Sequence, residues 1–345
     1  MSAGRARARA AVQASAATSD RRGPAPLVSV VVPTYRRPAL LARCLDALAE
    51  QDLGRSAFEV IVVDDGRCDA SLQVVADRSR RSRLALRYLR LVSHRGPAAA
   101  RNAGWRAAAA AIVAFTDDDC VPSPGWLRAG IESLGEGIAG AWGKIVIPIS
   151  LRPTDYERDA SWLQQAEFAT ANCFLRRSVL EEVGGFDERF QLAWREDSDL
   201  YFTLIERGHE IRRIEPAVVI HPVRPARFGV SVLQQSKSMF NALLYKKHPA
   251  LYRARIQKSP PWRYYAILAS LVVLTAGVAR SDTALSAAGA AAWALLTAEF
   301  AVRRLRRTSR APRHVVEMIV TSAVIPFLSV YWRLRGAIRF RVFFL

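Results

Sequence analysis

The stretch AIVAFTDDDC, residues 111–120, joins an apolar run to three consecutive carboxylates, Asp117, Asp118 and Asp119. An uninterrupted apolar run is typical of a strand that is buried on both faces of a sheet. Three adjacent carboxylates repel one another, so they become tolerable where a divalent cation and the hydroxyl groups of a ligand share their site. The stretch therefore predicts a buried strand that ends at a binding site.

Similar apolar runs alternate with helix-like segments on both sides of this strand. Further strands are expected at LVSVVVPTY (27–35), FEVIVVDDG (58–66), LRYLRLV (86–92) and EPAVVIHP (215–222). Helices are expected at PALLARCLDALAEQ (38–51), AAARNAGWRAAAAA (98–111) and REDSDLYFTLIERG (195–208). This alternation predicts an α/β fold with a mostly parallel sheet that is covered by helices. Polar residues follow the strands, and the carboxyl ends of parallel strands meet at one edge, where ligands bind.

The chain has 345 residues and a formal net charge of +19, but this charge is concentrated at its two ends. Residues 1–26 and 303–345 together hold 13 of the 19 net positive charges. The middle of the chain has no basic stripe interleaved with aromatic residues, so we expect no nucleic-acid partner. Residues 1–26 lack an apolar segment and are predicted to form a disordered basic arm. The four cysteines are widely spaced and are interpreted as reduced thiols rather than zinc ligands.

Two uncharged runs, 264–279 and 283–298, predict a membrane hairpin near the C-terminus. Helices over 263–279 and 283–302 would approach the length that crosses a bilayer, with flanking arginines at the interfaces. The alternative is a pair of buried helices in a soluble protein. Basic clusters on both flanks of the hairpin place its two ends on the cytosolic side. A third helix, about 315–333, contains Glu317 and Pro326 and is predicted to be re-entrant or interfacial.

The order of the motifs resembles that of the family 2 glycosyltransferases, over roughly residues 27–225. SVVVPTYRR resembles the opening strand of the family, VIVVDDG its second strand, RGPAAARNAG its phosphate-side helix and FTDDDC its D-x-D motif. GGFDERF followed by EDSDL resembles its acceptor-side signature. The resemblance implies a GT-A nucleotide-sugar-binding domain, Rossmann-like, over residues 27–258. A membrane region with C-terminal transmembrane helices, 259–345, would follow it.

The first two strand ends are candidates for the base and ribose pocket of a nucleotide-sugar donor. Pro33, Thr34 and Tyr35 end the first strand, and Asp64 and Asp65 end the second. A carboxylate at this position can accept a hydrogen bond from a base N–H or from a ribose hydroxyl. Taken alone, the DDG sequence is equally typical of a turn after a strand.

The resemblance also assigns roles around the D-x-D motif. It gives Asp117 to the ribose, and it gives Asp119 to a divalent cation, Mn²⁺ or Mg²⁺, that bridges the donor phosphates. His221 resembles the second protein ligand of that cation, and Asp118 is grouped with the donor site. Arg101 could meet the diphosphate with a bidentate guanidinium, although an arginine on an Ala-rich helix is commonly just solvated.

The acids that open the expected helix at 195–208 are candidates for the general base. Asp197 resembles the base that takes the proton of the acceptor hydroxyl, while Glu196 and Asp199 compete for the same role. The alternative is that these acids only cap the helix.

These observations predict a membrane-anchored inverting glycosyltransferase of the inner membrane that faces the cytosol and acts in cell-envelope glycan synthesis. Its predicted partners are a nucleotide-diphosphate sugar, a glycan or lipid-linked acceptor, and membrane lipids. Processive polysaccharide synthases of the family carry a Q-x-x-R-W motif, whereas this chain has LQQSKSMFNALLYKKHP (233–249), which favours transfer of a single sugar. A non-catalytic nucleotide-sugar-binding scaffold and a processive synthase remain the alternatives.

Overall fold

The computed structural model describes residues 12–15, 25–82 and 84–344, which form two compact units. Unit 1 is Met1–Pro148 with Leu163–Pro222, and unit 2 is Ile149–Trp162 with Val223–Leu345. Most of the predicted basic arm, residues 1–26, lies outside the described residues. The predicted domain bounds, 27–258 and 259–345, stay a prediction.

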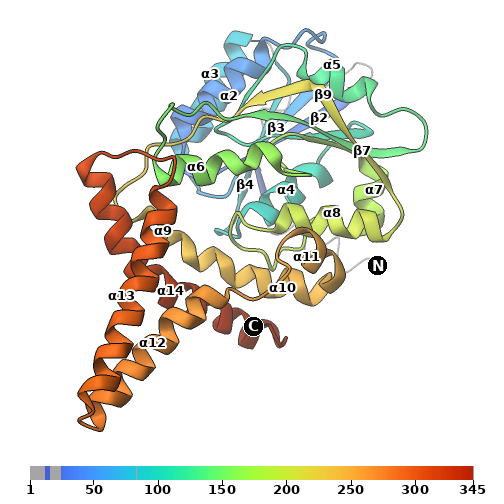
Figure 1. Ribbon diagram of the computed structural model, residues 1–345. Helices are drawn as coiled ribbons and strands as arrows, with labels where there is room; N and C mark the ends of the chain where they lie inside the picture. Colours follow the sequence, from blue (N-terminus) through green and yellow to red (C-terminus); the bar gives the residue numbers. More distant parts are fainter. Residues whose placement is uncertain (1–11, 16–24, 83, 345) are drawn as a thin grey trace. The chain divides into compact units, whose positions relative to one another are not determined.

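A mixed sheet forms the centre of unit 1 (Figure 1). In the described part of the chain its strands run in the order β1-β4-β3-β2-β5-β8-β7-β9-β6. They are β1 (Val12–Ser15), β2 (Val28–Thr34), β3 (Phe58–Asp64), β4 (Leu86–Leu91), β5 (Ile112–Phe115), β6 (Val121–Pro122), β7 (Ile138–Val146), β8 (Cys173–Arg176) and β9 (Glu210–Ile220). Strands β4, β3, β2 and β5 are mutually parallel, whereas β8 pairs antiparallel with both β5 and β7. The predicted α/β fold is therefore confirmed, with antiparallel pairs added beyond the parallel centre.

Helices cover the sheet of unit 1, as the alternation of apolar runs predicts. They are α2 (Pro38–Ala49), α3 (Asp69–Ser82), α4 (Pro97–Arg106), α5 (Trp126–Glu132), α7 (Arg177–Val183) and α8 (Glu196–Glu206). In α2 the apolar face consists of Leu41, Cys44, Leu45 and Leu48, all fully buried at helical spacing. Helix α4 packs closely on β2 and β3 because residue 104 is glycine: a Cβ there would lie 2.3 Å from Val31 Cγ1.

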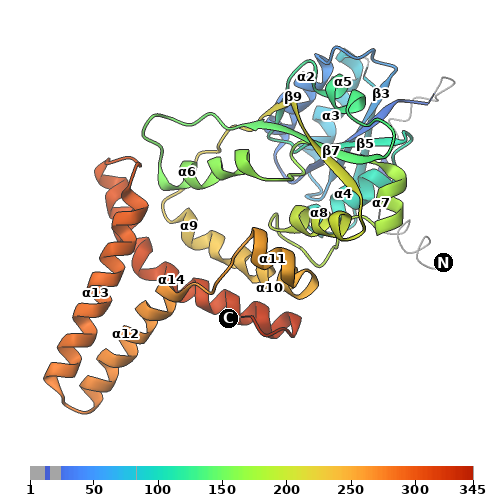
Figure 2. The ribbon, with the colours of Figure 1, turned by 45° about the vertical axis from the view of Figure 1, so that its right-hand side comes forward.

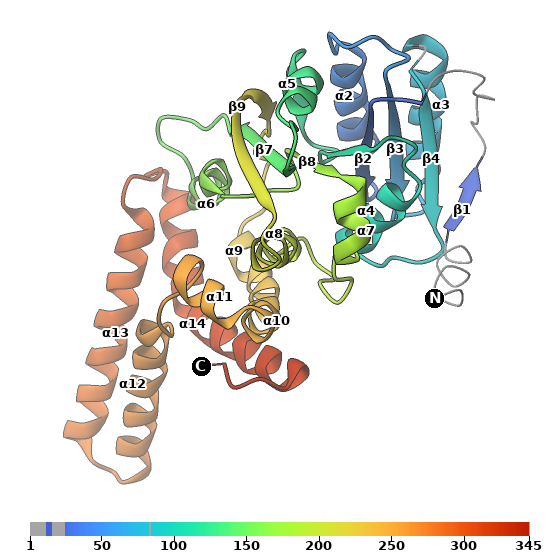
Figure 3. The same cartoon turned by 90° about the vertical axis from the view of Figure 1, so that its right-hand side faces the viewer.

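The register of the parallel strands brings their carboxyl ends together. Thr34, the last residue of β2, lies opposite Asp64, the last residue of β3. On the other side of β2, Phe115 at the end of β5 lies opposite Val31. Strands β2, β3 and β4 lie side by side in Figure 3. The polar residues that follow these strands therefore lie at one edge of the sheet.

Unit 2 is helical. Its elements are α6 (Asp155–Ser161), α9 (Val230–Leu233), the 3-10 helix η2 (Gln234–Met239), α10 (Phe240–Lys247), α11 (Pro249–Arg255), α12 (Trp262–Ala279), α13 (Thr283–Leu305) and α14 (Pro312–Phe340), while the 3-10 helix η1 (Trp162–Gln165) crosses the unit boundary. Helices α12 and α13 form a hairpin, and α14 runs obliquely to it (Figure 2). All three are long and apolar enough to cross a membrane. The predicted hairpin helices are thus present, with the second one extended to Leu305.

Helix α14 has two different faces. One face packs within unit 2 and buries residues such as Met318, Ile325 and Val330. The other is an exposed apolar stripe at spacings of three and four residues, formed by Val316, Ile319, Val320, Val324, Phe327, Tyr331, Leu334 and Ile338. A single apolar stripe along a helix with arginines near both ends is typical of a helix in the membrane interface. The interfacial placement of this segment stays a prediction.

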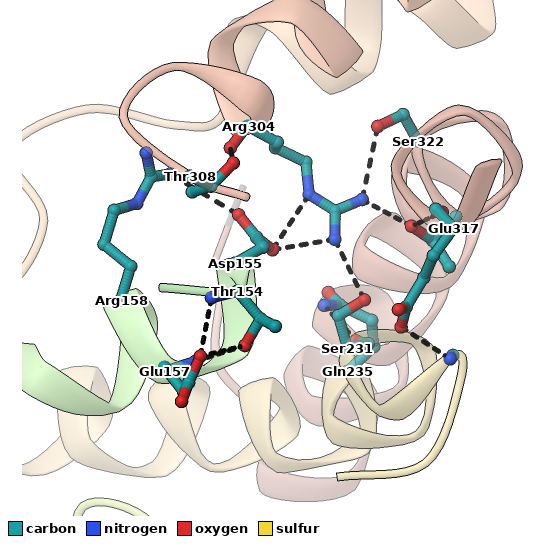
Figure 4. A network of polar contacts seen from close by, with 12 residues as sticks. Thr154, Asp155, Glu157, Arg158, Ser231, Gln235, Arg304, Thr308, Glu317 and Ser322 are labelled. Atoms are coloured by element: carbon teal, nitrogen blue, oxygen red, sulfur yellow. Dashed lines mark hydrogen bonds and ion pairs between the residues drawn. The ribbon is translucent and has the colours of Figure 1, made fainter. Parts of the chain in front are cut away.

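A buried arginine connects four elements of unit 2 (Figure 4). Arg304, near the end of α13, is 7% exposed, and its Nε and Nη2 donate to Asp155 Oδ2 on α6 at 3.1 and 2.8 Å. Its Nη1 donates to Thr321 Oγ1 and Ser322 Oγ of α14 at 2.6 and 3.2 Å. Its Nη2 also donates to Ser231 Oγ of α9 at 3.0 Å. Through these bonds the short insertion 149–162 becomes part of the helical unit.

Candidate active site

The three aspartates after β5 form a turn in which each carboxylate points to a different partner. The turn is closed by the N–H of Cys120, which donates to the carbonyl oxygen of Asp117 at 3.0 Å. Asp117 accepts from Arg101 Nη2 of α4 at 2.8 Å, and Asp118 accepts from Thr34 Oγ1 of β2 at 2.7 Å. Asp119 lies beside His221, with 3.5 Å between Oδ1 and Nε2. The repulsion among the three is therefore reduced by separate partners.

Arg37 provides positive charge on the β2 side of this turn. Its Nη1 lies 3.2 Å from Asp118 Oδ1 and 3.2 Å from Asp119 Oδ2. Burial raises the pKa of Asp118 to about 7, against the opposing effects of Arg37 and Thr34. Burial also raises the pKa of Asp117, but the charges of Arg101 and His221 outweigh it and hold that pKa below its usual range.

The same turn offers a set of metal-binding groups. One ligand atom each from Asp117, Asp119, Cys120 and His221 lies within 4.8 Å of the others. Burial raises the pKa of the Cys120 thiol, and hard cations such as Mn²⁺ and Mg²⁺ prefer oxygen ligands to a thiol. The remaining two carboxylates and one imidazole suit Mn²⁺ or Mg²⁺. The predicted pair, Asp119 and His221, thus lies together, and Asp117 lies in the same cluster.

Arg101 is held between two acids from different parts of the chain. It is 3% exposed, and its Nη1 donates to Glu196 Oε1 of α8 at 3.0 Å while Nη2 donates to Asp117. Its Nε and Glu196 Oε2 are buried without a hydrogen-bond partner among the described residues. Arg101 therefore joins the D-x-D turn to the first residue of α8.

The first turn of α8 presents three acids in different environments. Glu196 is 4% exposed and paired with Arg101, and Asp199 is 2% exposed. Asp197 is half-buried, and its Oδ1 accepts from the neighbouring N–H of Ser198 at 2.7 Å. Burial raises the pKa of Asp197, although the Ser198 N–H and Arg195 oppose this effect. Asp197 is thus the acid of this turn that combines partial exposure with a raised proton affinity.

The residues at the ends of β2 and β3 differ in exposure: one ring faces solvent, whereas one carboxylate is buried and hydrogen-bonded. The Tyr35 ring is 38% exposed and lies 4.4 Å from the His94 ring, centroid to centroid. Asp64 is fully buried and accepts from the N–H groups of Gly66 and Cys68, each at 2.7 Å, and from the Tyr88 hydroxyl at 2.5 Å. These bonds occupy the Asp64 carboxylate within its own loop.

Asp65, the next residue, fixes the loop that leads into α4. Its carboxylate accepts from the N–H groups of Arg95 and Gly96 at 2.7 and 2.8 Å and contacts His94 Nδ1 at 2.7 Å. Pro33 precedes Thr34 within β2. Of the five residues predicted for the base pocket, Tyr35 therefore offers the exposed ring, whereas Asp64 and Asp65 shape the surrounding loops.

Three residues of this region were not predicted from the sequence. Arg37 and His94 lie in polar loops, where a basic side chain is expected to be solvated. Asn102 follows Arg101 in the sequence ARN and donates from Nδ2 to the Phe186 carbonyl at 2.8 Å and to Glu188 Oε1 at 2.9 Å. For Asn102 the available signal was its place in RGPAAARNAG and the place of its partners in GGFDERF.

Comparison with known proteins agrees with this geometry. The model of glycosyl transferase family 2 matches residues 29–186, and that of glycosyl transferase family group 2 matches residues 156–304. Glycosyltransferase AglE of Haloferax volcanii is 29% identical over 225 residues, which are 61% of this chain and 71% of that protein. Validoxylamine A glucosyltransferase of Streptomyces hygroscopicus subsp. jinggangensis is 32% identical over 271 residues, 66% of this chain and 62% of that protein. The chain therefore matches less than two thirds of the length of the second relative.

A solved structure shares the fold at low sequence identity. A mannosyltransferase from Pyrobaculum calidifontis in complex with GDP-Man and Mn²⁺ superposes with a TM-score of 0.55 and 21% identity, over 90% of this chain and 88% of that one. The mixed sheet, the D-x-D turn at its edge and the two overlapping family matches agree with one another. The chain belongs to the family 2 glycosyltransferases and has their GT-A fold followed by apolar C-terminal helices.

Proposed function

We propose that the chain is an inverting, metal-dependent glycosyltransferase that moves one sugar from a nucleoside-diphosphate donor to a glycan or lipid-linked acceptor. The observation that carries this proposal is the meeting of Asp117, Asp119 and His221 at the edge of the sheet, with Arg101 joining them to α8. A donor diphosphate needs positive charge, and a sugar-transfer base needs a carboxylate close by. Both kinds of group lie around the D-x-D turn.

On the donor side, Asp119, His221 and Asp117 would hold the divalent cation. When bound, such a cation stabilises the negative charge that develops on the departing diphosphate. The exposed Tyr35 ring, next to His94, offers a flat surface for the base. Thr34 and Arg37 hold Asp118 in the turn and so keep its neighbours in position.

On the acceptor side, Asp197 takes the proton. The acceptor oxygen attacks the anomeric carbon while its proton passes to the Asp197 carboxylate, and the bond between that carbon and the diphosphate oxygen breaks. A raised pKa favours this role because a stronger base accepts a proton more readily near neutral pH. Glu196 is committed to Arg101, so it orients this region instead of acting as the base.

The apolar helices support a membrane location for the reaction. Helices α12 and α13 meet the length and hydropathy of membrane spans, and basic residues lie before α12 and at the end of α13. Because basic residues favour the cytosolic side, we place the enzyme in the inner membrane with its catalytic domain in the cytosol. A lipid-linked acceptor in cell-envelope glycan synthesis fits that location.

A screen of nucleotide-sugars, with and without Mn²⁺ or Mg²⁺, tests this proposal on the full-length protein. A ligand at a hundred times its dissociation constant stabilises the fold by about 2.7 kcal/mol, which is readily seen as a higher melting temperature. The donor found in this way is then incubated with acceptor candidates, and the products are weighed by mass spectrometry. One added sugar supports the proposal, a ladder of additions would indicate a processive synthase, and donor binding without any product would indicate a scaffold.

Asp197→Asn separates the base from the binding site. Asparagine keeps the shape of the side chain but does not accept the proton, so turnover should fall by about a hundred- to ten-thousand-fold with donor affinity retained. Glu196→Gln is the matched variant at the neighbouring position, and its loss should be smaller. Near-normal single-turnover rates in Asp197→Asn would place the base elsewhere.

A further inference from the structure

Unit 2 contains a polar pocket that the proposed reaction does not use. It has a volume of about 550 Å³ and lies where η2, α10, the start of α12 and the middle of α14 meet. Serine, asparagine and glutamine side chains line it together with two arginines, Arg263 and Arg333. Among the described residues that line the pocket, none is acidic. This composition suits an anionic ligand.

Arg333 is the buried cation of this pocket. It is 5% exposed, and its Nη1 donates to the neutral amide oxygen of Gln257 at 3.2 Å. Its guanidinium also lies 3.7 Å from the centroid of the Phe344 ring. Arg263 has a carboxylate partner, since its Nε lies 3.1 Å from Glu299 Oε2. Arg333 and Arg263 therefore both bring a guanidinium to the pocket, Arg333 from a buried position and Arg263 from beside Glu299.

The surroundings place the pocket at the level of lipid headgroups. Trp262 and Tyr264 line it, and they are also the first residues of the apolar helix α12. Tryptophan and tyrosine concentrate at membrane–water interfaces, and Trp262 is 65% exposed. The segment RARIQKSPPWR, residues 253–263, carries four basic residues and no acid. Such a juxtamembrane basic segment attracts anionic lipids.

We propose that this pocket binds the phosphate headgroup of an anionic membrane phospholipid. The Arg333 guanidinium donates to the phosphate oxygens, for which its fork geometry is well suited. Hydroxyl and amide groups of the lining, including Ser329 and Gln257, complete the polar contacts, and the Trp262 ring lies along the glycerol and acyl region. This site is separate from the transfer reaction, so the proposal goes beyond the function given above and stands independently of it.

Binding of a fluorescent short-chain phosphatidylglycerol to the detergent-solubilised full-length protein tests the proposal by anisotropy. Arg333→Gln should weaken binding by about tenfold to a hundredfold, because charge-assisted hydrogen bonds to the phosphate are lost. Ser329→Phe keeps every charge but fills the pocket and should weaken binding to a similar extent. Lys258→Gln is the matched control: it removes an exposed basic residue of the same segment that does not line the pocket, and its effect should stay within about fivefold, the contribution of one juxtamembrane charge.

Two further measurements identify the source of the phosphate. Phosphatidylcholine and inorganic phosphate are offered as competitors, and both should displace the probe far less than unlabelled phosphatidylglycerol. Displacement by inorganic phosphate at equal concentration would overturn the lipid assignment in favour of a free anion. Equal losses in Arg333→Gln and Lys258→Gln, or full binding in Ser329→Phe, would overturn the pocket itself. Melting curves of the variants verify that each remains folded. Arg333→Gln removes a charge whereas Ser329→Phe fills the pocket, so the two variants test the site independently.

Discussion

Removing the charge of Arg101 should destabilise unit 1 far more than removing that of Arg106, the other arginine of α4. The Arg101 side chain is 4% exposed and is shared by Glu196 and Asp117, whose side chains are 5% and 26% exposed. Arg101→Met keeps the length of the side chain but leaves the Glu196 carboxylate buried without its counter-charge. Breaking a buried pair on one side costs about 3–5 kcal/mol.

In a unit of roughly 200 residues, each kcal/mol corresponds to about 2–4 °C in melting temperature, so Arg101→Met should melt about 6–20 °C lower. The double variant with Glu196→Gln added to Arg101→Met no longer contains the unpaired buried carboxylate and should regain half or more of the lost melting temperature. The double-mutant cycle gives the coupling between the two residues directly. Arg106→Met, on the same helix with a side chain 42% exposed, is the control and should change the melting temperature little.

The pH dependence of this variant provides an internal check. Burial raises the pKa of Glu196, mainly against the opposing charge of Arg101, and without Arg101 it should rise further. A carboxyl whose pKa is higher in the folded than in the unfolded state gains stability as the pH falls through the folded pKa. The difference in melting temperature between the wild type and Arg101→Met should therefore become smaller as the pH is lowered from 8 to 5. Differential scanning fluorimetry of the full-length protein measures these melting temperatures. A difference from the wild type that does not change with pH, or a melting temperature that does not rise when Glu196→Gln is added, would refute the account.

Three other predictions concern separate parts of the molecule. Asp119→Ala should abolish the effect of metal on donor binding and His221→Ala should weaken it, as measured by thermal shift with and without Mn²⁺; unchanged metal dependence in both would contradict the site. Burial raises the pKa of Asp197, so kcat/KM should begin to fall with decreasing pH above the ordinary aspartate pKa of about 3.9. A pH profile whose acidic decline is centred at or below that value would contradict the assignment. Arg304→Met leaves Asp155, whose side chain is 14% exposed, with Arg158 as a remaining cationic partner. It should therefore lower the melting temperature of unit 2 by less than the amount that corresponds to about 3–5 kcal/mol for a fully broken buried pair, whereas Arg310→Met at an exposed position should have little effect.

The parallel centre of the sheet could be predicted because buried strands produce continuous apolar runs. Strands β2 and β3 are such runs, and β2 is followed by helix α2, which has its own apolar face. Strand β8 has only the four residues CFLR, and its position between β5 and β7 depends on pairing with segments far away in the sequence. Short strands of this kind leave little local signal, so β8 and its antiparallel pairs with β5 and β7 were not predicted.

The candidate site shows the same division between local and distant information. The resemblance paired Asp119 with His221 and gave Asp117 to the ribose, and all three residues follow strands that end at one edge of the sheet. The partner of Asp119 at Arg37 lies 82 residues earlier, and that of Arg101 at Glu196 lies 95 residues later. An arginine in a loop or on an Ala-rich helix looks solvated in the sequence, and only the folded chain reveals its acid. The insertion at α6 is a similar case, since Asp155 meets Arg304 from 149 residues away.

The charges of the D-x-D region do not balance, and this imbalance bears on its function. The four carboxyl groups of Asp117, Asp118, Asp119 and Glu196 face two guanidiniums, those of Arg37 and Arg101, and the His221 imidazole lies beside Asp119. Uncompensated buried charge is unfavourable, and the raised pKa of Asp118 is one consequence of that burial. A divalent cation carries the charge that would balance the group. Two arginines from distant segments therefore offset part of the charge of the three adjacent aspartates, and a divalent cation at this edge of the sheet would offset more of it.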